Sequence, residues 1–375
     1  MATSIFNYCS LLFLFLLLFP FLTLSERCNP SDKKALLQLK KDLHNPYILA
    51  SWNPKDDCCD WYCVKCDEKT NRIISLDISS SVPDTDFSAQ IPDSIANLPY
   101  LQYLEFHKLP KLTGPLNPAI AKLTRLTFLR IDYTNLSGPI PDFLAQLKNL
   151  DLIILSHNNL SGPIPASLSQ LPKLGSLQLD HNKLTGPIPD SFGYFKSSPD
   201  LWLHNNQLSG KIPASLAKQN TTRILLQRNK LEGDASMLFS AKKTTEQLDI
   251  SRNMLSFDVS KVGFARTLIY LDMNHNKIYG KLPEGLNAVE NLQAFNGLIG
   301  CGAAAGGVEP TTEGVGVGEG GSRGFEALGL AAATSDANVS QGTFYMTCKS
   351  SEVERKAPND PRKWRRKAPN ENGGV

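Results

Sequence analysis

Residues 149–171 read NLDLIILSHNNLSGPIPASLSQL, and residues 173–195 read KLGSLQLDHNKLTGPIPDSFGYF. Both fit the pattern L-x-x-L-x-L-x-x-N-x-L-x-G-x-I-P. Self-similarity at a period of about 20 to 50 residues is the signature of a repeat architecture. The patterned Asn recurs in steps of 24, 24, 23, 24 and 23 residues, at Asn158, Asn182, Asn206, Asn229, Asn253 and Asn276. The sequence therefore predicts a solenoid.

The repeat extends toward the N-terminus in a less regular form. Thr134 holds the place of the Asn one unit earlier, and two further units surround RIISLDIS (72–79) and LQYLEFHK (101–108). Leucines such as Leu177 and Leu179 alternate inward on a short strand. A single unit cannot bury its apolar face, so the units stack and share one core. About nine complete units over 73–296, with a tenth truncated, predict an α/β leucine-rich-repeat solenoid, a right-handed superhelix with a parallel β-sheet on its concave face.

The other recurring residues have structural explanations. The Asn amide can satisfy backbone groups of adjacent turns when it points inward. Glycine at the place of Gly162 and Gly186 permits a backbone bend that a Cβ would hinder. The Ile-Pro pairs that follow favour an extended segment.

The N-terminal region indicates secretion. Residues 11–24, LLFLFLLLFPFLTL, form a short apolar run, and we expect residues 1–25 to be a cleaved signal peptide. No later segment of the sequence is long and apolar enough to predict a membrane span. The net charge of +3 is too small to suggest binding to nucleic acid. Five cysteines between 28 and 66 are consistent with an oxidising compartment.

Residues 26–72 are expected to form a cysteine-rich N-terminal cap. Asp32 can cap a helix that carries Ala35, Leu36, Leu39 and Leu43 on one apolar face. Such a helix would shield the first open end of the solenoid core.

The repeat ends abruptly after Phe295. The template requires an apolar residue at 297, where the sequence has Gly, and an Asn at 300, where it again has Gly. Residues 297–375 are rich in Gly and Ala and end in a basic stretch, so we predict a disordered tail that is foreign to the fold. A frame change or mis-joined coding segment is a hypothesis that would explain this tail.

Several motifs resemble the polygalacturonase-inhibiting proteins of plants, over about 270 of the 375 residues. They are RCNPSDKKALLQLKKDL (27–43), SWNPKDDCCDWYCVKCD (51–67), NLPYLQYLEFHKLPKLTGPLNPAIAKL (97–123), QRNKLEGDASMLF (227–239) and NHNKIYGKLPEGL (274–286). The resemblance implies a monomer secreted to the cell wall or apoplast that inhibits fungal or insect endo-polygalacturonases, with pectin as a further candidate partner. It also implies that Cys28 pairs with Cys58 and Cys59 with Cys66, which leaves Cys63 spare. The tenth repeat and cysteine-stapled C-terminal cap usual in this family are missing or overwritten here.

Outward positions on the predicted concave face are the candidate contacts with the enzyme. Aromatic and Arg side chains often dominate interfaces, which favours Trp202, Arg228 and Tyr270. Acidic Asp132, Asp180, Asp249 and Asp272 are expected to meet cations in the cleft of the enzyme. The whole set is His107, Arg130, Asp132, Gln178, Asp180, Trp202, His204, Gln227, Arg228, Asp249, Arg252, Tyr270, Asp272 and His275.

We expect neither catalysis, nor a cofactor, nor a metal site. No nucleophile motif or phosphate loop is evident, and the carboxylates lie on separate strands. His157, His181, His204 and His275 lie at strand ends, and we expect them to stack singly without a compact ligand set. Asn135, Asn159 and Asn220 are in N-x-S/T sequons and are predicted to be glycosylated. The alternatives to an inhibitor are an ice-binding protein, a ligand-sensing ectodomain and the inactive product of a damaged gene.

Overall fold

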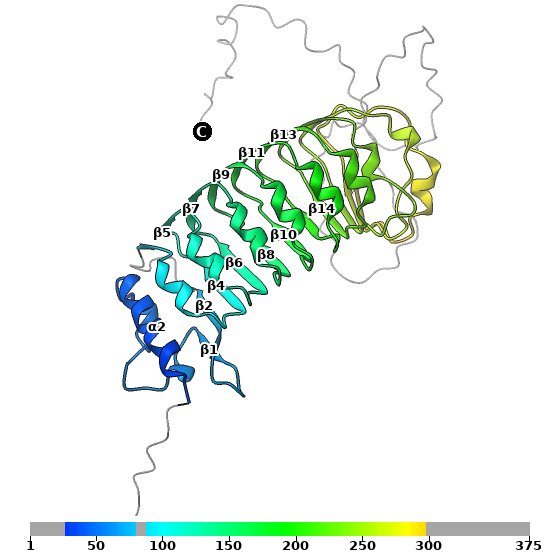
Figure 1. Cartoon of the computed structure of the whole chain (residues 1–375). Helices are drawn as coiled ribbons and strands as arrows, with labels where there is room; N and C mark the ends of the chain where they lie inside the picture. The colour runs from blue at the N-terminus through cyan, green and yellow to red at the C-terminus, as the bar shows by residue number, and fades with distance from the viewer. Residues whose placement is uncertain (1–26, 80–87, 298–375) are drawn as a thin grey trace, which may run out of the picture.

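A computed structural model describes residues 27–79 and 88–297. Two predictions therefore fall outside the described residues: the signal peptide over 1–25 and, apart from Gly297, the tail over 297–375. The described chain is a solenoid whose coils stack in chain order, with the N-terminal helix at one end and the last strands at the other (Figure 1).

One long sheet runs through every coil. Its first pair, β1 and β2, is antiparallel, and all later neighbours are parallel. The register is constant, so that Leu129, Ile153 and Leu177 lie side by side. The strands, in their order across the sheet, are β1 (Val64–Cys66), β2 (Ile73–Ser79), β4 (Tyr103–His107), β6 (Phe128–Asp132), β8 (Leu152–Ile154), β10 (Ser176–Gln178), β12 (Asp200–Trp202), β14 (Arg223–Leu225), β16 (Gln247–Asp249), β18 (Tyr270–Asp272) and β19 (Ala294–Asn296).

A second, parallel sheet follows the consensus Asn in each coil. Its strands are β3 (Ala89–Gln90), β5 (Leu112–Gly114), β7 (Asn135–Gly138), β9 (Asn159–Pro163), β11 (Lys183–Gly186), β13 (Gln207–Lys211), β15 (Lys230–Gly233) and β17 (Met254–Leu255). Short 3₁₀-helices complete most coils: η3 (Asp93–Asn97), η4 (Pro118–Lys122), η5 (Asp142–Gln146), η6 (Ala166–Gln170), η7 (Asp190–Tyr194), η8 (Ala214–Lys218), η9 (Ser236–Leu238), η10 (Val259–Lys261) and η11 (Glu284–Ala288). The predicted leucine-rich-repeat fold is confirmed.

The core is a column of inward side chains from successive coils. Leu177 and Leu179 are fully buried, as are their counterparts in the neighbouring coils. The bend at the end of most second-sheet strands depends on glycine: Gly162 of β9 and Gly186 of β11 have φ values of 78° and 75°, a region that residues with a Cβ rarely adopt.

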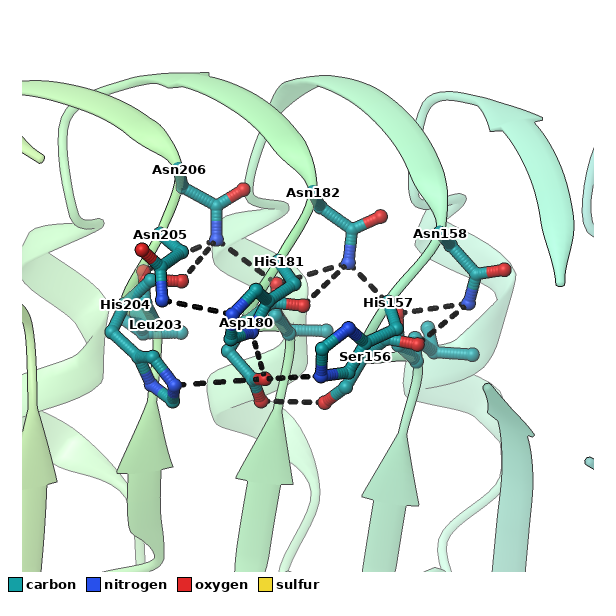
Figure 2. A network of polar contacts seen from close by, with 12 residues as sticks. Ser156, His157, Asn158, Asp180, His181, Asn182, Leu203, His204, Asn205 and Asn206 are labelled. Atoms are coloured by element: carbon teal, nitrogen blue, oxygen red, sulfur yellow. Dashed lines mark hydrogen bonds and ion pairs between the residues drawn. The ribbon is translucent and has the colours of Figure 1, made fainter. Parts of the chain in front are cut away.

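The consensus Asn forms a ladder inside the solenoid, as predicted. The Asn182 amide donates to the carbonyl oxygens of Leu155, Leu179 and Asp180 at 2.8, 3.1 and 3.1 Å, and its own oxygen accepts from the Leu160 amide at 3.0 Å. Each such side chain therefore satisfies backbone groups of its own coil and the preceding coil, which water cannot reach. Three rungs of the ladder are drawn in Figure 2.

The N-terminal end is covered by helix α2 (Pro30–Asp42) and two 3₁₀-turns, η1 (Tyr47–Leu49) and η2 (Cys58–Asp60). The predicted apolar face is confirmed, since Leu36 and Leu39 are fully buried. The prediction that Asp32 caps this helix is wrong. Asn29 is the N-cap and accepts from the Ser31 amide.

Asp32 instead anchors the helix to the first coil. It is buried within the first turn, where its carboxylate accepts two hydrogen bonds from the Arg72 guanidinium at 2.8 and 2.7 Å. A third comes from the Ile73 amide at 2.9 Å. The disulfides Cys28–Cys58 and Cys59–Cys66 are those that the resemblance implied, and Cys63 carries a free thiol.

At the other end, β19 is the last described strand. Phe295 pairs in register with Leu271 of β18. Leu271 is fully buried, whereas Leu292 and Phe295 are only partly buried against the core. Within residues 27–79 and 88–297, no helix is long and apolar enough to cross a membrane.

Candidate partner-binding face

The candidate residues lie on the outward face of the long sheet and on the turns that follow it. We call this surface the sheet face and define it by the outward side chains of β2 to β19 and the residue before each consensus Asn. Because neighbouring strands are about 4.8 Å apart, outward side chains of adjacent coils can contact each other. The predicted residues therefore meet in clusters.

A row of turn residues borders the sheet face. The residue before each consensus position adopts a left-handed backbone conformation, with φ between 51° and 56°. Three predicted residues belong to this row and are exposed: Arg228, Arg252 and His275. Tyr133 and His181 occupy the same place in their own coils and are also exposed. Tyr133 was missed by the sequence analysis, although its position directly before Thr134 could have revealed it.

The first cluster is centred on Asp132 at the end of β6. Arg130 donates to both oxygens of Asp132, each at 2.9 Å, and to Glu105 at 3.2 Å. His107 Nδ1 lies 2.7 Å from the same carboxylate. Tyr103 donates to Glu105 and stacks on Phe128 with ring centroids 4.0 Å apart. Asp132, only 3% exposed, therefore has a close partner at each of its oxygens.

The second cluster is centred on Asp180, after β10, and is 48 residues further along the chain (Figure 2). Asp180 Oδ2 faces three imidazoles: His181 Nδ1 at 2.9 Å, His204 Nε2 at 3.7 Å and His157 Nε2 at 3.9 Å. Oδ1 accepts a hydrogen bond from the Ser156 hydroxyl. These residues come from three successive coils, and Asp180 is 5% exposed. The expectation that the histidines stack singly is wrong for these three, because they converge on one carboxylate, whereas His275 lies outside the cluster.

The aromatic rings in the second cluster are also stacked on each other. Tyr133, His157 and His181 form a continuous stack with centroid separations of 4.0 and 3.9 Å, and His204 meets His181 edge-on at 5.2 Å. Burial lowers the pKa of His157 and of His204, with the neighbouring His181 adding to the shift and Asp180 opposing it. Burial therefore disfavours the charged form of these two imidazoles.

The third cluster is formed by β16 and β18. Asp249, 6% exposed, accepts two hydrogen bonds from Ser251 and lies 3.5 Å from the Tyr270 hydroxyl. The ion pairs found in the described residues do not include Asp249. Burial raises the pKa of its carboxyl, and the charge of Asp272 adds to the shift.

The clusters correct the expectation about acidic residues. Asp132, Asp180 and Asp249 were expected to meet cations of a partner, but all three are buried and already bound within the sheet face. Asp272 is half-buried and retains some access to solvent. The remaining predicted residues are half-buried on the face: His107, Arg130, Gln178, Trp202, His204, Gln227 and Tyr270.

The second sheet carries a regular row of hydroxyls that the sequence analysis did not consider. Each residue sits between the Leu and the Gly of its repeat and is exposed or half-buried. The row, which we call the hydroxyl row, is Thr113, Ser137, Ser161, Thr185 and Ser209, and the following coil has Glu232 in this place. Ser137 and Ser161 are also the hydroxyl residues of the sequons at Asn135 and Asn159.

Family models match four parts of the chain. The leucine rich repeat N-terminal domain matches residues 29–67, and leucine-rich-repeat models match 124–184, 200–219 and 267–288. A polygalacturonase inhibitor of Vitis vinifera is 57% identical over 125 residues, covering 33% of this chain and 36% of that protein. One from Pyrus communis is 58% identical over 111 residues, covering 30% of this chain and 32% of that protein. The chain belongs to the plant leucine-rich-repeat proteins and is related to polygalacturonase inhibitors.

Among solved structures, a plant ice-binding protein matches this leucine-rich-repeat chain with a TM-score of 0.70 and 48% identity. The match covers 73% of the chain and 89% of the ice-binding protein. By contrast, the matches to the curated inhibitors span about a third of their length. These curated relatives are inhibitors and not enzymes.

Proposed function

We propose that this leucine-rich-repeat protein is secreted to the plant cell wall and inhibits microbial endo-polygalacturonases through its sheet face. The observation that carries the proposal is the relation to polygalacturonase inhibitors, at 57% identity over 125 residues. The chemistry of the sheet face supports it. Outward positions change from coil to coil in charge, size and aromaticity, which suits a protein partner better than a regular lattice.

Trp202 is the strongest candidate for an anchor on this face. It lies between Gln178 of β10 and Leu225 of β14, half-buried, with its ring 6.3 Å from that of His204. Its Nε1 is buried without a hydrogen-bond partner among the described residues, so a partner protein would contact the accessible part of the ring and not the N–H group. Arg228 and Arg252 on the bordering row add exposed cationic groups nearby.

The test is a titration of the secreted chain against a fungal endo-polygalacturonase, with Trp202→Ala as the variant. Truncating a hot-spot Trp costs about 2 kcal/mol or more, so the inhibition constant should rise about 30-fold. Tyr194→Ala is the matched control, because Tyr194 is 57% exposed but lies on η7, outside the sheet face. Equal losses in both variants would argue against binding through the sheet face.

A second experiment tests whether residues 297–375 affect inhibition. A version in which a cysteine-stapled cap of the family type replaces these residues should be assayed beside the natural chain. Inhibition by both would show that the sheet face suffices. Inhibition by the repaired version alone would identify the natural chain as the inactive product of a damaged gene.

Ice binding is a second candidate function, favoured by the hydroxyl row and by the 48% identity to a plant ice-binding protein. The regular Asn ladder cannot serve, because its amides point inward and bind the backbone. A thermal-hysteresis assay of the purified protein tests this reading, with Thr185→Lys in the middle of the row as the variant. We expect no hysteresis. A signal that Thr185→Lys abolishes would instead support ice binding.

Glycosylation bears on the same choice. We propose that Asn135, Asn159 and Asn220 are glycosylated, and the first two lie on β7 and β9 beside the hydroxyl row. Glycans at these positions would cover the row and leave the sheet face accessible. Intact-mass measurement before and after enzymatic deglycosylation of the secreted protein would detect them, and an unchanged mass would contradict the proposal.

A further inference from the structure

We propose that His157, Asp180 and His181, with His204 as a fourth ligand, form a binding site for a divalent transition-metal ion, for which Zn²⁺ is the appropriate probe. Imidazole and carboxylate groups are standard zinc ligands, and imidazole also suits Cu²⁺ and Ni²⁺. This property is independent of enzyme inhibition, because it concerns the side chains of one cluster and needs no partner protein.

The spacing of the donor atoms fits one ion. In a tetrahedral zinc site, with bonds of about 2.0–2.1 Å, the ligand atoms lie about 3.3 Å from each other. Around Asp180 Oδ2 the three imidazole nitrogens lie at 2.9, 3.7 and 3.9 Å, which brackets this value. The donor atoms of His157, Asp180 and His181 all lie within 4.8 Å of one another. An imidazole nitrogen binds a metal ion in the plane of its ring, so the stacked rings of His157 and His181, 3.9 Å apart and nearly parallel, must rotate out of their stack to share the ion, and His204 must move toward it.

Two of the ligands already have outer support, the arrangement that usually fixes metal-binding side chains. The Ser156 hydroxyl binds Asp180 Oδ1 and leaves Oδ2 directed at the imidazoles. The side-chain amide of Asn205 lies 3.0 Å from His181 Nε2, the nitrogen that faces away from Asp180, and with its oxygen turned toward the ring it can accept the Nε2 proton that a metal-bound Nδ1 requires.

An ordinary hydrogen-bonded cluster does not account for this geometry. Of the three imidazoles, only that of His181 is within hydrogen-bond distance of Asp180, while the Nε2 atoms of His157 and His204 lie 3.9 and 3.7 Å from the same oxygen. The Asp132 cluster shows the alternative, since the contacts of Arg130 and His107 with its carboxylates are all between 2.7 and 3.2 Å. A buried carboxylate whose one oxygen faces three imidazole nitrogens across these gaps is an arrangement that a cation could fill.

The ligands come from three successive coils, on the turns after β8, β10 and β12. An ion bound there would link those coils in the folded state only. Binding to the folded state alone stabilises it by mass action, so zinc should raise the unfolding temperature in a concentration-dependent way.

The experiment is a titration of the full secreted chain, carrying no polyhistidine tag, with Zn²⁺ by calorimetry and with Co²⁺ by visible absorption. We expect one ion per chain and cobalt bands typical of a four-coordinate site with nitrogen and oxygen ligands. His157→Phe keeps a ring in the stack and removes the donor nitrogens. Since losing even an outer-shell group costs about 10- to 100-fold in affinity, this variant should bind at least tenfold more weakly.

Two histidines serve as controls. His275→Ala removes an exposed imidazole at the same template position, and His107→Phe removes the imidazole of the closed cluster. Both should bind Zn²⁺ as the unmodified chain does. Absence of binding, or equal weakening in His157→Phe and His275→Ala, would overturn the proposal. Asp180→Asn is a second test variant, and circular dichroism would verify that it is folded. If the folded variant bound Zn²⁺ with unchanged affinity, the proposal would also be overturned.

Discussion

Asp132 and Asp180 occupy the same template position two coils apart, at 3% and 5% exposure, yet their surroundings differ. Asp132 is held by a cationic Arg130 and by His107 at hydrogen-bond distance. Asp180 has three imidazoles in place of a guanidinium, two of them beyond hydrogen-bond distance. Asp249, two positions earlier in its coil, faces another carboxylate. The repeat therefore determines where a carboxylate is buried. The side chains around that carboxylate determine whether it is fully paired and stabilises the fold, or is left with room for a ligand.

The largest effect is expected from Asp132→Ala. It removes the only carboxylate that binds Arg130 at two nitrogens and leaves His107 without its close partner. Breaking a buried ion pair costs about 3–5 kcal/mol, and water reaching the partly exposed guanidinium should reduce the loss to about 2–3 kcal/mol.

Urea unfolding monitored by circular dichroism measures this loss. Asp151→Ala is the control, because Asp151 is exposed and its substitution should change stability by less than about 0.5 kcal/mol. If Asp132→Ala were as stable as this control, the closed cluster would have no structural role.

A smaller effect of opposite sign is expected from Asp249→Asn. The folded-state pKa of Asp249 is raised above its ordinary 3.8 by burial and by Asp272. The folded protein therefore favours the protonated carboxyl, and the side chain costs stability once the pH rises above 3.8 toward the folded pKa. Asn can keep the hydrogen bonds from Ser251, so the variant should gain about 1 kcal/mol at pH 7.

The sign is checked by repeating the unfolding at pH 3.5. Below the ordinary pKa both folded and unfolded carboxyls are largely protonated, so the difference between Asp249→Asn and the unmodified chain should shrink there. A variant that is less stable at pH 7 would show that the charge of Asp249 is compensated by a group not yet identified.

The smallest effect is expected from His157→Phe in buffer treated with a chelator. The Nε2 of His157 lies 3.9 Å from Asp180, too far for a hydrogen bond, and Phe retains the stack on Tyr133. The unfolding free energy should therefore change by less than about 0.5 kcal/mol. A large loss would mean that His157 stabilises the fold itself and that the two clusters differ less than their distances suggest.

Much of the fold could be predicted from the sequence, because the pattern that specifies the fold lies within each repeat unit and recurs along the chain. The spacing of Leu177, Leu179 and Asn182, seen again in each unit, predicts the inward strand face and the internal ladder, and both are confirmed. The apolar face of α2 was predicted in the same way. Asp32 was misassigned because N-cap and first-turn positions favour the same residue types, and only the packing against Arg72 separates them.

The candidate site could not be predicted in the same way, because it depends on contacts between coils that no local sequence pattern specifies. The repeat gave the outward positions, so Trp202, Arg228 and His275 could be placed on one surface in advance. Whether a carboxylate there faces solvent, an Arg or another acid depends on side chains about one or two repeats away, and on the register that sets them side by side. The sequence by itself determined the solenoid, its core and its outward positions, since one periodic pattern specifies them all. Only the tertiary structure decided which outward groups meet, because stacking brings residues 24 apart within reach of each other.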